Sequence, residues 1–249
     1  MNNRTNIYFA SDLHLGAPNY QASLVREKLF VQWLDEIKQD AKEIYLVGDV
    51  YDFWFEYTTV IPKYFSRLHG KLAELTDDGI KIYFFSGNHD MWMFQYYQEE
   101  LNIEIIHKPI EIVLNDKLFY IGHGDGLGPK DYGYKFIKLF FRSKVCQLLF
   151  SFIHPDIGIQ LANFWSKRSR AGNGHKDAQF LGDDEWLLQY AKKKLAEKHV
   201  DFFVFGHRHY PLDLQITEQT RYINLGDWIT YFSYAKLEND TLTLLYYKK

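Results

Sequence analysis

Cysteine is nearly absent from this sequence, which contains only Cys146 among its 249 residues. A single cysteine can neither form an internal disulfide nor ligate a metal ion with a second thiolate, so a disulfide-rich secreted fold and a zinc finger are excluded. No apolar run reaches the ~18 residues that a membrane-spanning helix needs. Because no signal-peptide pattern precedes the first apolar run, we expect a cytoplasmic protein.

Aromatic side chains are abundant instead. They make up 18% of the residues, and apolar residues in all make up 47%. That is enough for a large core, and 249 residues fall within the range of one large domain with an insertion. We therefore predict a single domain over residues 1–249. The aromatic excess is typical of an aromatic core, a wide ligand cleft or an apolar surface that meets a lipid.

Short apolar runs and amphipathic segments alternate in the first part of the chain. The runs lie at 7–10, 44–47 and 82–85, and the first segment between them has apolar residues at helical spacing, over 22–39. This is the pattern of a buried, mostly parallel sheet. Further runs predict additional strands at 103–106, 110–114, 118–121, 202–205, 221–224, 231–237 and 242–247, with tight turns at Asn115-Asp116 and Asn239-Asp240.

Polar side chains follow five of these apolar runs, at the point where each run ends. They are Asp12 and His14, Asp49, Asn88 and His89, His123, and His207 and His209. The carboxyl ends of strands in an open α/β sheet form the edge at which sites are built. Each block alone could be a turn or a helix cap, but five blocks at five strand ends indicate one shared site.

These residue types favour a metal centre. Carboxylates, imidazoles and one amide, without a thiolate, suit Mn²⁺, Mg²⁺, Fe or Zn²⁺. Seven ligands are too many for one ion and suit a pair that shares a bridging carboxylate, with the ions about 3.5–4 Å apart. For His207 and His209 to reach separate ions, the backbone must turn between them, which Gly206 would ease. Arg208 between them would then face solvent or substrate.

The five blocks resemble, in order, those of the calcineurin-like metallophosphoesterases. They read Asp12-x-His14, Gly48-Asp49-x-x-Asp52, Gly87-Asn88-His89-Asp90, Gly122-His123 and Gly206-His207-x-His209, and together they span most of the chain. The resemblance implies a four-layer α/β/β/α sandwich. It also implies two divalent ions, one held by Asp12, His14, Asp49 and His209, the other by Asp49, Asn88, His123 and His207. Asp49 would bridge them.

The implied mechanism is hydrolysis of a phosphate ester. Two cations lower the pKa of a water molecule for in-line attack on phosphorus and neutralise charge on the phosphoryl oxygens. His89 suits a transition-state role, either stabilising charge or protonating the leaving oxygen, with the Asp90 carboxylate orienting its ring. The alternative is that His89 only supports the ligands and transfers no proton.

Residues of about 130–176, which we name the lid, form an insertion that combines basic and apolar side chains. The lid contains nine cationic residues and only two acidic ones, Asp131 and Asp156. Its net charge is therefore +7, while that of the whole chain is −3. Helical phasing places Phe136, Leu139 and Phe140 on one side. This combination suits a helical cover over a lipid phosphate or an interfacial membrane helix. The alternative is a helical hairpin packed on the core with a solvated basic rim.

With this lid, the chain is similar to the UDP-2,3-diacylglucosamine diphosphatases of lipid A biosynthesis. The shared features are Ser11-Asp12-Leu13-His14-Leu15-Gly16, Gly48-Asp49-x-x-Asp52, His123-Gly124-Asp125, Asp131-x-Gly133-Tyr134 and the basic stretch Arg168-Ser169-Arg170. The resemblance implies hydrolysis of the substrate diphosphate to UMP and 2,3-diacylglucosamine 1-phosphate with Mn²⁺, by a peripheral protein on the cytoplasmic face of the inner membrane. It implies substrate contacts from Asp131, Tyr134, Arg168, Ser169 and Arg170. Well-known members carry Arg at the position of His89.

Three alternatives compete with this interpretation. A metallophosphoesterase acting on another phosphodiester, pyrophosphate or phospholipid would have the same ligands. A DNA exonuclease is disfavoured because the basic charge is concentrated in an apolar segment and the total charge is negative, so we expect no nucleic-acid partner. A non-catalytic scaffold is disfavoured because all seven ligands are present. The histidines outside the blocks are expected at the surface or behind the ligands, with His175 a weak candidate for substrate contact.

Overall fold

Two stacked β-sheets form the centre of the computed structural model, which describes residues 4–128, 132–173 and 179–247. The first sheet has six strands in the order β11-β10-β1-β2-β3-β4. Its members are β1 (Asn6–Ala10), β2 (Ala41–Val47), β3 (Lys81–Phe85), β4 (Glu104–Ile106), β10 (Ser233–Glu238) and β11 (Thr241–Tyr246). Strands β1 to β4 run parallel to one another, and β10 joins β1 in the antiparallel direction. The parallel sheet predicted from the apolar runs is therefore confirmed.

The second sheet has five strands in the order β5-β6-β7-β9-β8. Its members are β5 (Ile110–Leu114), β6 (Lys117–Gly122), β7 (Phe202–Phe205), β8 (Leu212–Thr217) and β9 (Thr220–Asn224). The central strands β6, β7 and β9 are parallel, and the outer strands are antiparallel to their neighbours. Both residues of the predicted turn between β5 and β6, Asn115 and Asp116, have positive φ, as a tight hairpin requires.

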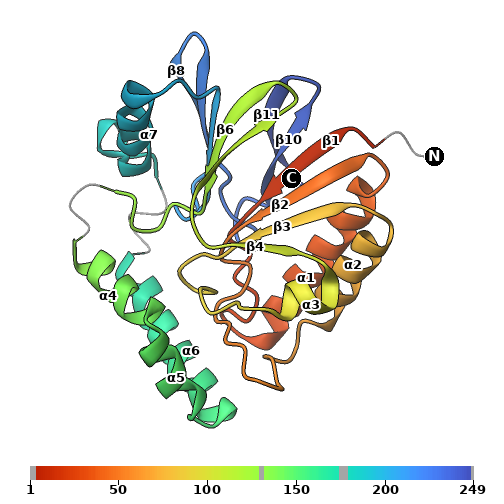
Figure 1. Ribbon diagram of the computed structural model, residues 1–249, viewed down its shortest axis with the longest axis vertical. Coiled ribbons are helices and arrows are strands. Elements are labelled where there is room, and N and C mark those ends of the chain that lie inside the picture. Colours follow the sequence, from red (N-terminus) through yellow and green to blue (C-terminus); the bar gives the residue numbers. More distant parts are fainter. Residues whose placement is uncertain (1–3, 129–131, 174–178, 248–249) are drawn as a thin grey trace.

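Helices cover the outer face of each sheet, which gives four layers (Figure 1). Helices α1 (Tyr20–Ile37), α2 (Ser66–Asp77) and α3 (Tyr96–Leu101) flank the first sheet, and α7 (Trp186–Glu197) flanks the second. A 3₁₀ turn, η1 (Gly182–Asp184), precedes α7. The predicted α/β/β/α sandwich is confirmed.

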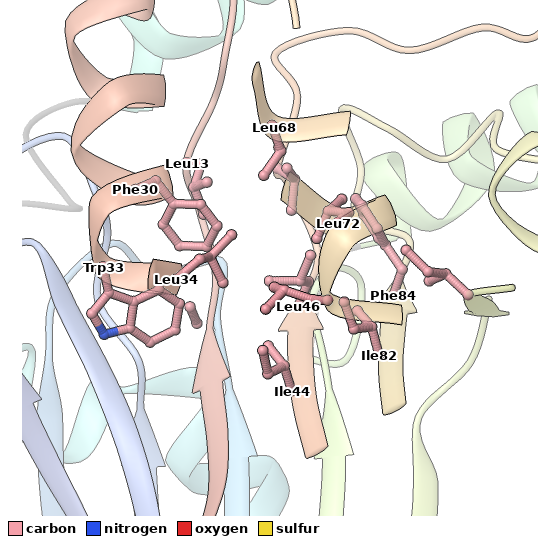
Figure 2. Close-up of a cluster of buried hydrophobic side chains, with 14 of the residues drawn as sticks. Leu13, Phe30, Trp33, Leu34, Ile44, Leu46, Leu68, Leu72, Ile82 and Phe84 are labelled. Atoms are coloured by element: carbon pink, nitrogen blue, oxygen red, sulfur yellow. The ribbon is translucent and has the colours of Figure 1, made fainter. Parts of the chain in front are cut away.

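Apolar side chains fill the space between these layers. Figure 2 shows Phe30, Trp33 and Leu34 of α1 beside Leu68 and Leu72 of α2, all packed on the first sheet. Between the two sheets, β1 and β2 contribute Phe9 and Val47, while β6 and β7 contribute Ile121 and Val204. Strand residues apolar on both faces explain why these strands read as continuous apolar runs in the sequence. The two sheets are thereby fixed relative to each other.

The lid forms three helices, α4 (Tyr132–Arg142), α5 (Lys144–Ser151) and α6 (Pro155–Asn173), which extend away from the sheets in Figure 1. They meet the rest of the molecule through an aromatic cluster in which Phe150 of the lid is buried with Phe55 and Trp92. The indole N–H of Trp92 also donates to the backbone carbonyl of Phe141, at 2.7 Å. The lid thus packs on the sandwich through this aromatic cluster.

Candidate metal centre

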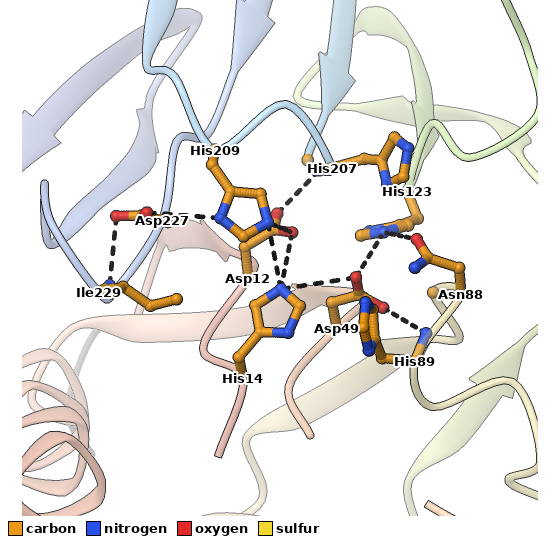
Figure 3. A network of polar contacts seen from close by, with 12 residues as sticks. Asp12, His14, Asp49, Asn88, His89, His123, His207, His209, Asp227 and Ile229 are labelled. Atoms are coloured by element: carbon orange, nitrogen blue, oxygen red, sulfur yellow. Dashed lines mark hydrogen bonds and ion pairs between the residues drawn. The ribbon is translucent and has the colours of Figure 1, made fainter. Parts of the chain in front are cut away.

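All seven expected ligands converge where strands of both sheets end (Figure 3). The loops after β1, β2 and β3 bring Asp12, His14, Asp49 and Asn88 from the first sheet, and those after β6 and β7 bring His123, His207 and His209 from the second. Parallel strands end at a common edge, so residues far apart in the chain meet there. The site therefore spans the seam between the two sheets.

Five of these residues have a left-handed backbone. Their φ angles are +55° at Asp12, +44° at His14, +51° at Asp49, +67° at His207 and +53° at His209. Such angles are uncommon for residues other than glycine, and they cluster at functional sites where the surrounding fold holds them. The turn that separates His207 from His209 is thus made by the histidines themselves and not by Gly206, as the sequence had led us to expect.

Gly206 is needed for a different reason. A Cβ atom at Gly206 would lie 2.6 Å from Oδ2 of Asp12, and one at Gly87 would lie 2.2 Å from Oδ1 of Asp49. Both glycines allow the backbone of one loop to approach the carboxylate of another. The motif glycines therefore bring the loops close together.

Asp12, His14 and His209 form the first group of side chains. Nε2 of His14 lies 3.1 Å from Nε2 of His209 and 3.6 Å from Oδ1 of Asp12. Nε2 of His209 lies 3.3 Å from the same Asp12 oxygen. Atoms bound to one ion at about 2.1 Å are separated from each other by about 3 Å, so this spacing fits a common ion. Asp49 adjoins the group, with Oδ2 3.6 Å from Nε2 of His14.

The second group lies on the other side of Asp49. Oδ2 of Asp49 is 3.3 Å from Nε2 of His123, and the same nitrogen is 3.3 Å from Oδ1 of Asn88. Asp49, His123 and His207 each present a ligand atom, all within 4.8 Å of one another. A single oxygen, Oδ2 of Asp49, therefore lies between the two groups, as a bridging carboxylate would.

The charges of the two groups are coupled through their carboxylates. Burial alone would raise the pKa of Asp12, but His209 and His14 outweigh it and lower that pKa to about 2. Burial disfavours the charged form of His123 as well, yet Asp49 raises the pKa of His123 to about 10. The carboxylates therefore remain ionised and attract positive charge, and a cation bound there would replace the proton of His123.

These residues fit a pair of divalent ions. Oδ1 of Asp12 is buried and, within the described residues, accepts no hydrogen bond, although the ring nitrogens of His209 and His14 lie 3.3 and 3.6 Å away. Burial of an ionised oxygen that accepts no hydrogen bond is costly, and coordination of a cation would offset that cost. The donor set has carboxylates, imidazoles and an amide, which suits hard or borderline ions such as Mn²⁺ or Zn²⁺.

His89 lies beside both groups, and one of its two ring nitrogens, Nδ1, is hydrogen-bonded. Its Nδ1 lies 3.0 Å from the backbone carbonyl of Asp52. Because a carbonyl can only accept, Nδ1 carries the proton, and Nε2 is the nitrogen left to accept a proton or to donate one when the ring is charged. Burial lowers the pKa of His89 to about 4, against the opposing effect of the Asp49 carboxylate, which raises it.

Asp90 has a different position from the one expected of it. Its carboxylate accepts hydrogen bonds from the backbone N–H groups of Gly87 at 2.7 Å and Val50 at 2.8 Å, with longer ones from Asp49 and Tyr51. The polar partners of Nδ1 of His89 are Asp52 and Ser166 instead. Asp90 thus orders the loop that carries Asp49, and orientation of the His89 ring falls to other residues.

Arg208 does not face solvent, which was one of the two orientations expected for it. It is buried and forms a two-pronged ion pair with Glu185, with Nε 2.6 Å from Oε1 and Nη2 3.2 Å from Oε2. The left-handed angles at His207 and His209 turn the side chain between them away from the ligands. Arg208 therefore ties the ligand loop to the segment that precedes α7.

Asp227 is a functional side chain that the sequence reasoning missed. Its Oδ2 lies 3.5 Å from Nδ1 of His209, while its Oδ1 accepts from the backbone N–H groups of Thr230 and Tyr231. A carboxylate behind a ligating histidine fixes the ring orientation. The signal was available, because Gly226-Asp227 follows an apolar strand just as Gly48-Asp49 does.

The expected substrate residues lie where the structure describes least. Asp131 lies outside the described residues, and so does His175. Tyr134 falls in α4 and the stretch Arg168-Ser169-Arg170 falls in α6, but their side chains are outside what the structure describes. Their contacts with substrate therefore remain predictions.

A cavity of about 580 Å³ lies between the lid and the metal centre. Asn88 and His89 form part of its polar wall, together with Asp52, Lys138 and Ser166. The rest is mainly aromatic, and includes Phe53, Trp54, Trp92, Phe140, Phe141 and Trp165. The cavity thus joins a polar reaction site to an apolar chamber.

Many apolar side chains of the lid face solvent. Phe136 is 74% exposed, Leu139 72% and Phe152 79%. Others are Phe140, Val145, Leu148, Leu149, Ile157 and Phe164. The predicted stripe on α4 is therefore present but is not buried in the core: Phe136 and Phe140 line the open cavity, and Leu139 faces solvent. This argues against a hairpin whose apolar face packs on the core. Among the described helices, none combines the length and the apolar character needed to cross a bilayer.

Comparison with known proteins adds independent information. A family model described as calcineurin-like phosphoesterase matches residues 5–211. The curated UDP-2,3-diacylglucosamine hydrolase of Porphyromonas gingivalis is 37% identical over 97% of this chain and 97% of its own. The protein of the same name from Haemophilus influenzae is 26% identical over 89% of this chain and 90% of its own. Among solved structures, Vacuolar Protein Sorting 29 from Cryptosporidium parvum aligns with a TM-score of 0.45 at 12% identity, over 96% of this chain and 95% of that one.

Proposed function

The chain belongs to the calcineurin-like phosphoesterase family, and from this premise we propose that it hydrolyses the diphosphate of UDP-2,3-diacylglucosamine to UMP and 2,3-diacylglucosamine 1-phosphate. The observation that carries the proposal is the apolar cavity under the lid, because it ends at Asn88 and His89. A diphosphate joined to an acylated sugar has this same division into a charged and an apolar part. The name and 37% identity of the P. gingivalis relative point to the same substrate.

The proposed centre holds two divalent ions, for which we favour Mn²⁺. One would be held by Asp12, His14, Asp49 and His209, the other by Asp49, Asn88, His123 and His207. Bound there, the ions would supply positive charge against the phosphoryl oxygens and a water of lowered pKa. Asp227 would hold His209 in register through Nδ1, from 3.5 Å.

His89 is the residue that we propose for proton transfer. With Nδ1 directed to the carbonyl of Asp52, its Nε2 is the atom that would stabilise or protonate the leaving oxygen. Burial keeps the ring neutral in the free protein, and the negative charge of a bound diphosphate would favour its protonated form. The ring therefore gains its charge when substrate is present.

The lid serves, in this proposal, as the contact with lipid. Acyl chains would enter the cavity through the aromatic residues of α4, α5 and α6, with further contacts from Asp131, Tyr134, Arg168, Ser169 and Arg170. The outward apolar residues, accompanied by the lid's cationic ones, suit peripheral binding to an anionic membrane surface, which we propose is the cytoplasmic face of the inner membrane. A membrane-bound substrate would then be reached from the surface.

The test is turnover of the proposed substrate. Purified protein with Mn²⁺ is mixed with UDP-2,3-diacylglucosamine in detergent micelles, and the products are identified by mass. We expect UMP and 2,3-diacylglucosamine 1-phosphate, and neither product with Asp49→Ala. Release of nitrophenol from bis(p-nitrophenyl) phosphate without any release of UMP would contradict the substrate and favour a phosphoesterase of another specificity.

A further inference from the structure

We propose that the lid positions the metal ligands through two polar contacts, Ser166 with Asp52 and Lys138 with Asp125, so that each half of the centre depends on the seating of the lid. The inference rests on the metal sites of the proposed function but not on its substrate. It assigns positioning roles to two lid residues that cover the cavity.

The first contact is made by α6. Ser166 is buried, at 6% exposure, and its hydroxyl donates to Oδ1 of Asp52 at 3.0 Å. That carboxylate oxygen lies 3.4 Å from Nδ1 of His14, on the opposite edge of the ring from Nε2, which faces Asp12 and Asp49. Asp52 thus stands directly between a lid helix and a proposed ligand of the first ion.

The same serine also reaches His89. Its Oγ lies 3.3 Å from Nδ1 of His89, which is 3.0 Å from the backbone carbonyl of Asp52. Since Nδ1 donates, the serine oxygen can accept from it while its own hydrogen is directed to Asp52. One hydroxyl on the lid therefore fixes the carboxylate behind His14 and the ring of His89 together.

The second contact is made by α4, on the other sheet. Nζ of Lys138 donates to the backbone carbonyl of Asp125 at 2.9 Å and pairs with the Asp125 carboxylate. Asp125 is buried and follows His123 by two residues, on the loop that supplies a proposed ligand of the second ion. Helix α6 of the lid therefore contacts the loop after β2, and helix α4 contacts the loop after β6.

These contacts transmit position because the groups that they hold are buried. A buried carboxylate that loses a charged or hydrogen-bonding partner must find a new one, and the loop that carries it shifts to do so. Groups behind metal ligands commonly change metal affinity or activity 10–100-fold when they are removed. Because these contacts come from a helical insertion, the positions of the metal ligands depend on whether the lid is packed against the sandwich.

The experiment compares metal-free protein with two variants, Ser166→Ala and Lys138→Met, in calorimetric titrations with Mn²⁺. We expect each variant to weaken one of two binding steps about tenfold, with Ser166→Thr restoring the first. On bis(p-nitrophenyl) phosphate we expect kcat to fall about tenfold with KM within about twofold, because that substrate does not need the acyl chamber. The matched lid controls Ser151→Ala and Lys144→Met, both at exposed positions on α5, should match the wild type.

The outcomes separate this inference from the proposed function. Variants that retain wild-type thermal midpoints and bind both Mn²⁺ ions as the wild type does would overturn it. Failure of the wild type to release UMP would contradict only the proposed substrate, because the Mn²⁺ titrations do not use that substrate. If Lys138→Met fails to fold, Lys138→Gln provides the same reading of the second step, and the Ser166 variants test the first independently.

Discussion

The loops of the metal centre and the helices of the lid expose opposite kinds of side chain. In the loops, Asp12, His14 and Asp49 are at most 1% exposed, whereas on the lid Phe136 and Phe152 are more than 70% exposed. Burying charge and exposing apolar surface are each unfavourable for folding. That both occur in one molecule teaches that each region is shaped by a binding partner, which we propose to be a cation in the first and a lipid in the second. The following predictions separate the two regions.

The largest effect is expected from Asp49→Ala. Because one oxygen of Asp49 lies between the two groups of ligands, its loss should disrupt both. Removal of groups behind ligands alone costs 10–100-fold, so we expect turnover of bis(p-nitrophenyl) phosphate to fall by more than about 100-fold. The lid control is Asp156→Ala, whose exposed carboxylate should leave turnover unchanged. Retention of a tenth of the activity by Asp49→Ala would show that the centre is not built around a bridge.

His89→Ala should lower kcat about 100-fold, since proton transfer by a positioned histidine contributes about 10²–10⁴-fold. Affinity for Mn²⁺, measured by calorimetry, should stay within about threefold of the wild type. His154→Ala on the lid, where the ring is largely exposed, serves as the control. If metal affinity falls together with kcat, His89 supports the ligands and does not transfer a proton.

Replacing outward apolar residues of the lid should weaken membrane binding and leave the chemistry intact. For Leu139→Ser and Phe152→Ser, neither of which lines the cavity, we expect binding to anionic vesicles, measured by sedimentation, to fall roughly tenfold per residue. Val113→Ser is the matched control, because Val113 is 63% exposed but lies on β5 of the sandwich. Equal losses at Val113 and Phe152 would remove the distinction between lid and body.

The smallest effect concerns His69, a partly buried histidine of the body that lies outside the metal centre. His69 contacts the hydroxyl groups of Tyr51 and Tyr97 at 3.0 and 3.1 Å, and burial lowers its pKa from 6.5 to about 4. The unfolded chain then binds a proton that the folded protein does not, so stability falls as the pH drops from 6.5 towards 4. At pH 5.5 the loss is about 1 kcal/mol relative to pH 7.

The variant His69→Gln should remove that part of the pH dependence while keeping a hydrogen-bonding group near the tyrosines. Urea unfolding at pH 7 and pH 5.5 gives the free energy of unfolding of the metal-free wild type and variant. The change between the two pH values is then compared between the two proteins. The same pH dependence in both proteins would mean that His69 is not held neutral in the core.

The strand-end loops were predictable because their signal is local. An apolar run followed by Gly-Asp or Asp-x-His marks both the strand and the side chain at its end, and sheet geometry brings the ends together. The same rule would have found Asp227, which follows β9. It could not find Ser166 or the pairing of Arg208 with Glu185, because those contacts join segments whose proximity no local pattern records.

The rest of the fold shows the same limit. Helices α3 and α7 and strand β8 were not predicted, and each lies beside chain segments that are remote in sequence or at an edge of a sheet. For the lid, helical spacing correctly grouped Phe136, Leu139 and Phe140, but spacing gives only the face of a helix and not what that face meets. The direction in which that apolar face points depends on how the three lid helices pack on the sandwich.

The seam between the sheets gives the proposed ions a mechanical consequence. Each ion would take ligands from both sheets, so it would act as a crosslink at the edge where β1, β6 and β7 end. The far edge is joined by apolar packing and by hydrogen bonds from Asn115 to the carbonyl of Asn239 and from Arg221 to the carbonyl of Leu242. Metal coordination would then restrict sliding of one sheet over the other more strongly at the ligand edge than the hydrogen bonds do at the far edge. Removal of the ions should therefore increase amide hydrogen exchange along the ligand edge first. The proposed ions would then stabilise the packing of the two sheets in addition to their role in the chemistry.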